Sequence, residues 1–206
     1  AGKDVRGMGG TIEVQHLCKA FGGKPVLCDF SASIPAGAVT AVMAPSGGGK
    51  TTLLRILMGL EPADSGAVTG LAGLRQSAVF QEDRLCDNLS AAANIRLVNP
   101  TLSPAQVEEA LAAVGLENCA GQPVSEFSGG MRRRTAILRA LLAPWDILFL
   151  DEPFKGLDPG TKERVMADTR RRCTGRTVLL VTHDLGETEA LGAVQVLRLP
   201  QPEARL

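Results

Sequence analysis

The chain has 206 residues, enough for one large domain or for a core with a subdomain that buries a sizeable hydrophobic centre. Its 22 Lys and Arg residues balance 22 Asp and Glu residues, so no overall charge favours nucleic acid or an anionic membrane surface. No stretch approaches the roughly 18–20 apolar residues of a membrane-spanning helix. Residues 1–10 lack the apolar segment of a signal peptide and are predicted to be a flexible tail before a single domain at 11–206.

The cysteine and arginine patterns indicate in which compartment the protein works and which partners it lacks. The five cysteines are widely spread and form no C-x-x-C pair, which favours free thiols in a reducing compartment and argues against zinc. Two arginine runs, 132–134 and 170–172, are interpreted as solvated helix faces. We therefore expect a cytoplasmic protein without a nucleic-acid partner.

The first half of the chain alternates between short strands and a helix. Residues 11–14, 39–43 and 77–80 are β-type runs. Residues 51–60 have a helical pattern that ends at the turn-forming residues 61–66. This alternation is typical of an α/β protein.

From Cys86 to about Ala143 the composition changes to alanine- and leucine-rich helix. Ser103 followed by Pro104 predicts a helix start, and Gly115 predicts its end. Beyond this block, the apolar runs 147–150 and 178–181 suit strands of a parallel sheet covered on both faces. The pattern predicts an α/β core with an inserted helical subdomain.

Residues 44–51, APSGGGKT, match G-x-x-x-x-G-K-[ST] at every defined position but the first. Glycines at 47–49 allow backbone N–H groups to surround an anion, and the following helix adds its positive dipole end. Lys50 is expected to reach the β- and γ-phosphates of ATP, and the Thr51 hydroxyl to bind Mg²⁺. The other residues expected to contact the nucleotide in this stretch are Pro45, Ser46, Gly47, Gly48, Gly49 and Thr52.

Ala44 adds one methyl group where the motif begins with glycine. If that position needs a positive φ, the cost is on the order of 1–2 kcal/mol; otherwise it is negligible. We expect a normal or weakened phosphate loop.

The segment ILFLDEP at 147–153 places two carboxylates at the end of an apolar strand. Asp151 is expected to hold the Mg²⁺ shell. Glu152 follows directly and is expected to accept a proton from an attacking water. The carboxyl end of a strand is where open α/β sheets place ligands.

The stretch FSGGM at 127–131 resembles the Leu-Ser-Gly-Gly-Gln signature of ABC transporter ATPase subunits. Four more stretches resemble motifs of that family in its order: KAFGGKPVL with Phe21, VFQED with Gln81, GLD at 156–158 and VTHD with His183. Together they cover about residues 11–200 and are more specific than a phosphate loop alone. FQEDRL and DEPF further resemble the ATPases of nitrate, sulfonate and taurine importers.

The resemblance implies a P-loop NTPase core with a mostly parallel sheet, a small N-terminal antiparallel β region, and an inserted helical signature subdomain at about 86–143. It also implies a head-to-tail homodimer that holds Mg-ATP between one phosphate loop and Ser128, Gly129 and Gly130 of the other copy. The ring of Phe21 then stacks on adenine, and Asp158 links the two sites.

Further roles follow from the same resemblance. Glu152 polarises water, His183 contacts the γ-phosphate, and Gln81 senses Mg²⁺ and water. Each of these residues taken alone also has a structural interpretation: His183 as a hydrogen-bonded histidine at a strand end, Gln81 as a surface amide and Phe21 as a core residue. The order of the motifs favours the functional interpretation, most strongly for His183 and Gln81.

Several residues depart from the family pattern. These are Ala44, the outer signature residues Phe127 and Met131, and Lys155, where the family usually carries serine. Residues 85–88 also replace the Leu-Pro-Trp element common in the nitrate, sulfonate and taurine group, which leaves the cargo open.

The resemblance places transmembrane permease subunits near Gln81–Leu89, on the inner face of the membrane, and adds a solute-binding protein to the complete importer. Three alternatives remain at this point: an ATPase of the same fold serving soluble partners, a nucleotide-binding module that has lost hydrolysis, and a phosphotransferase.

Overall fold

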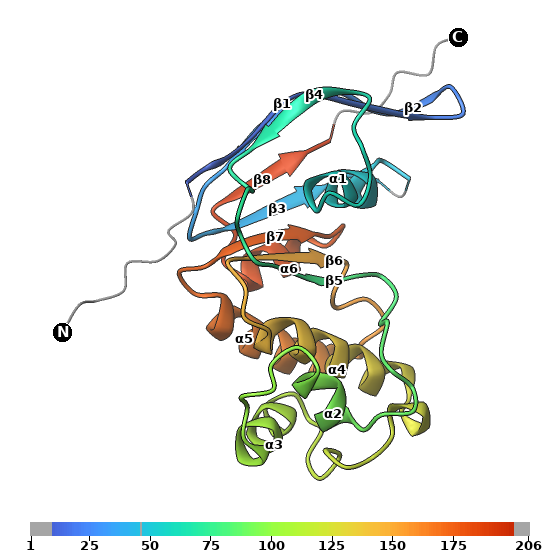
Figure 1. Cartoon of the computed structure of the whole chain (residues 1–206), viewed down its shortest axis with the longest axis vertical. Coiled ribbons are helices and arrows are strands. Elements are labelled where there is room, and N and C mark those ends of the chain that lie inside the picture. Colours follow the sequence, from blue (N-terminus) through green and yellow to red (C-terminus); the bar gives the residue numbers. More distant parts are fainter. Residues whose placement is uncertain (1–9, 46, 200–206) are drawn as a thin grey trace, which may run out of the picture.

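A five-stranded parallel sheet forms the centre of the computed structural model, which describes residues 10–45 and 47–199. Its strand order is β5-β6-β7-β3-β8. In chain order the strands are β3 (Val39–Met43), β5 (Gln76–Val79), β6 (Ile147–Asp151), β7 (Thr177–Val181) and β8 (Gln195–Arg198). Every neighbouring pair is parallel, so all carboxyl ends lie along one edge, on the right in Figure 1.

Both faces of this sheet are covered, which explains the continuous apolar runs. Helix α1 (Lys50–Leu57) lies above β5, β6 and β7 in Figure 1, and α4 (Gly129–Leu142) and α5 (Pro159–Cys173) lie below the sheet. Ile147 and Phe149 pack in the upper core, whereas Leu148 and Leu150 pack in the lower one. Since side chains of a strand alternate between faces, burial on both sides requires apolar residues at every position.

A three-stranded antiparallel sheet covers α1 from above (Figure 1). Its order is β2-β1-β4, with β1 (Ile12–Phe21), β2 (Lys24–Ile34) and β4 (Ser65–Thr69). The predicted strand at 11–14 is too short, because β1 continues to Phe21 through a shift of register between Val14 and Leu17. His16, inside this irregularity, has a φ of +49°, so the apolar alternation is interrupted there.

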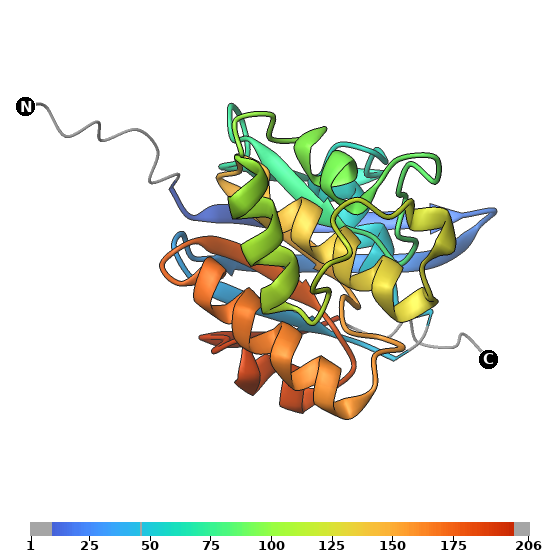
Figure 2. The same ribbon diagram turned by 90° about the horizontal axis from the view of Figure 1, so that it is seen from below.

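The helical block lies on the lower face of the parallel sheet. It contains α2 (Ala91–Arg96), α3 (Pro104–Ala113), the short 3₁₀ helix Val124–Glu126 and α4. Ser103 caps α3 as expected, through a capping box with Gln106. Figure 2, which is seen from below, shows α3, α4 and α5 side by side in front of the sheet.

Helix α6 (Leu185–Ala190), α5 and β8 complete the fold and were not predicted individually. The predicted flexible tail falls almost entirely on residues 1–9, which lie outside the described residues, as do residues 200–206. The five cysteines are free thiols.

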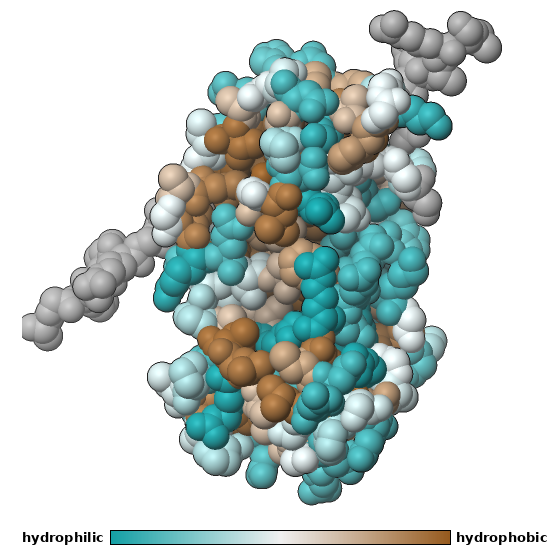
Figure 3. Space-filling view, turned by 45° about the vertical axis from the view of Figure 1, so that its right-hand side comes forward, coloured by the Kyte–Doolittle hydropathy of each residue, from teal (hydrophilic) through white to brown (hydrophobic). Residues whose placement is uncertain are grey.

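The surface has a mixed character. On the face shown in Figure 3, hydrophobic side chains gather in an upper and a lower patch, with hydrophilic side chains between them. In the part of the chain that the structure describes, we find no helix with both the length and the apolarity needed to cross a bilayer.

Candidate nucleotide-binding site

Four loops carry most of the predicted site residues, and each follows the carboxyl end of a parallel strand. Residues 44–49 follow β3, Gln81 lies just beyond β5, Glu152 follows β6, and His183 lies just beyond β7. Because these ends share one edge, the loops converge where open α/β sheets bind ligands. A cavity of about 400 Å³ opens there, lined by residues 47–52, Gln81, Glu152 and Lys155, with Val26 from β2.

The phosphate loop turns tightly into α1. Gly47 and Gly49 have φ values of +77° and +82°, a conformation that side-chain-bearing residues rarely adopt. A Cβ at Gly49 would lie 2.7 Å from the carbonyl oxygen of Val26, so only glycine fits. The turn exposes the N-terminus of α1 to the cavity, an arrangement that favours an anion. Ser46 lies outside the described residues.

Lys50 is the first residue of α1 and is only 6% exposed. Its ammonium Nζ donates to the carbonyl oxygens of Ala44 at 2.6 Å and of Pro45 at 3.0 Å. The charge is thus held across the loop by two neutral acceptors rather than by a carboxylate. No carboxylate of residues 10–45 or 47–199 pairs with this ammonium, and a phosphate in the cavity would supply an anionic partner.

Ala44 carries no backbone penalty. In the described part of the chain, five non-glycine residues have a positive φ, and Ala44 is not among them. Its methyl group is buried in the upper core. The free-energy cost of an alanine with a positive φ therefore does not apply to Ala44.

Thr51 and Gln81, which line the cavity, meet Asp151 at its wall. The Thr51 hydroxyl donates to Asp151 Oδ2 at 2.9 Å, and Gln81 Nε2 lies 3.2 Å from Thr51 Oγ1 and 3.4 Å from Asp151 Oδ1. Asp151 is 3% exposed, and burial raises the pKa of its carboxyl. A hydroxyl, an amide and a buried carboxylate are the oxygen donors that Mg²⁺ prefers, so the donor set fits this ion.

Asp151→Asn is expected to raise the melting temperature of the nucleotide-free protein near neutral pH. Burial raises the folded-state pKa of Asp151 above its ordinary 3.8, so ionisation of this carboxyl destabilises the fold. This cost to the free energy of unfolding is absent below the ordinary pKa of 3.8. It grows as the pH rises from that value to the folded-state pKa and is complete above it. Thermal unfolding near neutral pH should show a gain of a few degrees, since ~1 kcal/mol corresponds to about 2–4 °C at this size.

The gain should shrink toward about pH 4, and Mg-ATP should no longer stabilise the variant. Asp168→Asn is the matched control, because buried Asp168 is held by Arg171 at 2.6 Å and Arg172 at 2.7 Å, so its loss should lower stability. A lower melting temperature for Asp151→Asn at neutral pH would contradict the expected penalty.

Glu152 lies directly beyond β6 and is 8% exposed. Its carboxylate lies between two basic groups: Lys155 Nζ is 3.4 Å from Oε2, and His183 Nδ1 is 3.6 Å from Oε1. Its φ is +44°, and its N–H donates to the carbonyl oxygen of Val181 at 2.8 Å. A positive φ is uncommon for glutamate, and such conformations concentrate at functional sites.

The remaining predicted residues do not line the phosphate-loop cavity. Ser128 is exposed and caps α4, accepting from the Met131 N–H at 3.3 Å. Gly129 and Gly130 line a neighbouring cavity of about 400 Å³ that also touches Gln81, Glu152 and Lys155. His183 lines another with Pro45, and exposed Asp158 caps α5.

Phe21 ends β1 and is 47% exposed, so the interpretation of Phe21 as a core residue is wrong. The Lys19 ammonium lies 5.0 Å from the centroid of its ring. β2, which follows the hairpin turn after Phe21, supplies Val26 to the wall of the phosphate-loop cavity.

The interpretation of residues 132–134 as a solvated helix face is wrong for Arg133. Its side chain is 6% exposed and binds the loops that carry Gln81 and Glu152. Helical spacing offers the signal that was missed, because Arg133, Ile137 and Ala140 share the buried stripe of α4. Arg170 and Arg171 are exposed, as expected for the second run, whereas Arg172 is half-buried and binds buried Asp168 at 2.7 Å.

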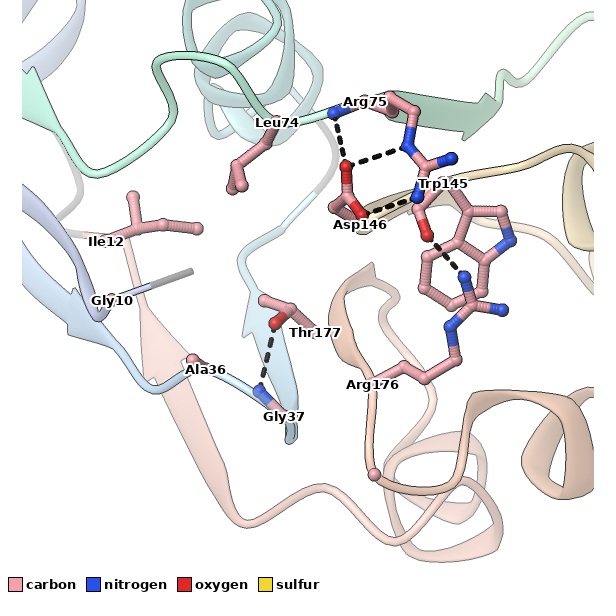
Figure 4. A pocket seen from close by; sticks show the side chains of 11 residues that line it. Gly10, Ile12, Ala36, Gly37, Leu74, Arg75, Trp145, Asp146, Arg176 and Thr177 are labelled. Carbon is pink, nitrogen blue, oxygen red and sulfur yellow. Dashed lines mark hydrogen bonds and ion pairs between the residues drawn. The ribbon is translucent and has the colours of Figure 1, made fainter. Parts of the chain in front are cut away.

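A different cavity, of about 250 Å³, lies at the opposite edge of the sheet (Figure 4). Its polar groups are paired with one another. Arg75 binds both carboxylate oxygens of Asp146, which holds the pKa of Asp146 at about 2, and Arg176 stacks on buried Trp145. These contacts fasten the starts of the strands together and leave the converging loops as the candidate site.

Comparison with known proteins agrees with this geometry. Residues 27–155 match the family described as ABC transporter. The taurine import ATP-binding protein TauB of Escherichia coli O157:H7 is 34% identical over 93% of this chain and 80% of its own length. The aliphatic sulfonates import ATP-binding protein SsuB 2 of Burkholderia cenocepacia is 38% identical over 93% and 74%. The Fe(3+) ions import ATP-binding protein FbpC of Streptomyces coelicolor is 40% identical over 87% and 57%. The chain belongs to the ABC transporter family, as one of its ATP-binding, ATP-hydrolysing subunits.

Proposed function

We propose that this chain binds Mg-ATP in the phosphate-loop cavity and hydrolyses it to drive a bacterial importer of a small solute. The contact of Thr51 with Asp151, with Gln81 beside both, carries the proposal, because it joins a phosphate loop to an Mg²⁺ donor set. Calorimetry of the purified chain should give saturable heat with Mg-ATP, together with phosphate release. Absence of both would contradict the proposal.

Each residue has a separate role in the proposed hydrolysis of ATP. Lys50 and the N–H groups around Gly47–Gly49 hold the β- and γ-phosphates, and Mg²⁺ neutralises their charge when bound by Thr51, Gln81 and Asp151. Glu152 accepts a proton from the attacking water. The oxygen of that water bonds to the γ-phosphorus, and ADP leaves. In this proposal His183, whose Nδ1 lies 3.6 Å from a carboxylate oxygen of Glu152, contacts the γ-phosphate.

A second copy of the chain completes the site in this proposal. The exposed turn at Ser128–Gly130 opens α4, and its N–H groups and helix dipole suit the γ-phosphate of ATP held by the other copy. Exposed Asp158, which caps α5, links the two sites in this proposal. Hydrolysis then removes the γ-phosphate contacts and separates the copies, which is a ligand-driven population shift.

Phe21→Ala is expected to weaken ATP binding about tenfold, since base–aromatic stacking contributes roughly 1–3 kcal/mol. Phe21 is 47% exposed at a hairpin, so the melting temperature should change little. Calorimetry with ATP and with inorganic triphosphate measures the effect. The affinity for triphosphate, which has no base, should stay unchanged; equal loss for both ligands would remove Phe21 from the adenine site.

The work of hydrolysis is delivered to permease subunits in the proposed assembly. The relatives are named for import of taurine, aliphatic sulfonates and Fe(3+), which supports an importer with a separate solute-binding protein. The segment Gln81–Leu89, next to the Mg²⁺ donor set, is the proposed permease contact, and it places the chain on the cytoplasmic face of the membrane. Purification from native membranes should recover integral membrane proteins; recovery of soluble partners alone would favour a soluble ABC ATPase.

Loss of hydrolysis has little support. Ala44 and the altered signature residues prompted that alternative, but the φ of Ala44 is not positive and Ser128, Gly129 and Gly130 of the signature are retained. Lys50, Asp151 and Glu152 converge on one edge of the sheet, with His183 beside Glu152.

A further inference from the structure

Arg133 connects the two loops that carry Gln81 and Glu152. It extends from α4, the helix that begins directly after Ser128, and is 6% exposed. Toward the catalytic loop its guanidinium donates to the carbonyl oxygens of Pro153 at 2.7 Å, Glu152 at 2.8 Å and Asp151 at 3.2 Å.

The same guanidinium reaches the loop after β5. Its Nη1 donates to the carbonyl oxygens of Phe80 at 2.5 Å and Gln81 at 3.3 Å, and to Asp83 Oδ1 at 3.2 Å. A buried guanidinium is costly unless its donors are satisfied. Here neutral carbonyls from two loops satisfy most of them, so neither loop can move without breaking charge-assisted hydrogen bonds.

The hydrogen bonds of Arg133 also help to hold Glu152, whose backbone is strained. Glu152 has a φ of +44°, and conformations of this kind persist only where the surroundings fix them. Its N–H is held by the carbonyl oxygen of Val181, and its carbonyl oxygen is held by Arg133. With both ends of the residue fixed, the carboxylate is directed toward Lys155 and His183 at the cavity.

We propose that Arg133 is a positioning residue for hydrolysis, which holds Glu152 and Gln81 at a fixed separation without contacting ATP. The kinetic part of this inference rests on the proposed function. The planar fork of arginine is essential, because a single ammonium cannot span both loops. Since Arg133 lies on the helix that starts at the signature turn, it also joins that turn to the catalytic carboxylate.

Arg133→Ala is expected to lower the phosphate-release rate on the order of 100-fold, as expected for a displaced catalytic group. The KM for ATP and the Mg-ATP-induced thermal shift should change by less than about twofold, because Arg133 lines the neighbouring cavity beside Gly129 and Gly130 and not the phosphate-loop cavity. Millimolar guanidinium should restore turnover to Arg133→Ala but not to Glu152→Gln. Arg133→Lys, which keeps the charge, should fold and still show the low rate.

Hydrogen exchange provides a readout that does not depend on activity. In nucleotide-free Arg133→Ala, amides at 80–83 and 151–155 should exchange faster than in the wild type, and guanidinium should slow them again. Arg132→Ala is the matched control from the same helix, because Arg132 binds Asp87 and the Val124 carbonyl oxygen instead. Its rate and exchange should match the wild type.

Three outcomes overturn the inference: wild-type turnover in Arg133→Ala, activity lost together with ATP binding, or unchanged exchange at both loops. If the wild-type chain itself releases no phosphate, the proposed function fails, and the exchange experiment alone decides whether Arg133 holds the two loops. If Arg133→Ala does not fold, Arg133→Lys decides the kinetic part through kcat and KM.

Discussion

Glu152→Gln is expected to reduce the rate of phosphate release by about 10²–10⁴-fold, the usual contribution of a general base. Glutamine keeps the shape of the side chain but cannot accept the proton of the attacking water. Mg-ATP binding should persist, because Lys50 and the Thr51–Asp151 contact remain. Single-turnover phosphate release and calorimetry with Mg-ATP measure the two properties separately.

The same variant should accumulate an ATP-bound dimer, which size-exclusion chromatography with Mg-ATP detects. Glu163→Gln on the exposed face of α5 is the matched control and should behave as the wild type. Hydrolysis at the wild-type rate in Glu152→Gln would exclude Glu152 as the base and assign proton acceptance to another group.

Lys50→Ala is expected to abolish the stabilisation that Mg-ATP gives to the fold. At a hundredfold excess over its Kd, a ligand stabilises a protein by about 2.7 kcal/mol, and this gain should fall close to zero. The physical reason is that Lys50 is the buried cation of the phosphate loop, and its partners among the described residues are the neutral carbonyl oxygens of Ala44 and Pro45. Thermal unfolding with and without Mg-ATP tests this expectation.

Arg55→Ala removes a positive charge from the exposed face of the same helix and serves as the control. It should keep the full Mg-ATP shift. A Lys50→Ala protein that binds Mg-ATP with wild-type affinity would place the nucleotide elsewhere, and the converging loops would lose their proposed role.

Local sequence determined the elements whose signals lie within a few residues. Continuous apolar runs predicted β6 and β7, because strands covered on both faces need apolar residues at every position. Glycine, lysine and threonine at fixed spacing predicted the phosphate loop, since backbone geometry restricts the glycine positions and phosphate and Mg²⁺ chemistry restricts the other two. Ser103 and Pro104 predicted the start of α3, because a capping side chain and a proline at the first turn act within a few residues.

Tertiary structure decided whatever depends on residues far apart in the chain. β1 and β2 pair through irregular registers that interrupt the alternation of the pattern, so their extent was not readable locally. Charge alone did not distinguish Arg133 from Arg132, although only Arg133 is buried between loops about 50 and 20 residues away. Lys155 likewise became part of the site only when folding placed it in the cavity wall beside Glu152. Composition and spacing fix which chemistry a segment can supply, but folding of the sheet decides which of these groups meet.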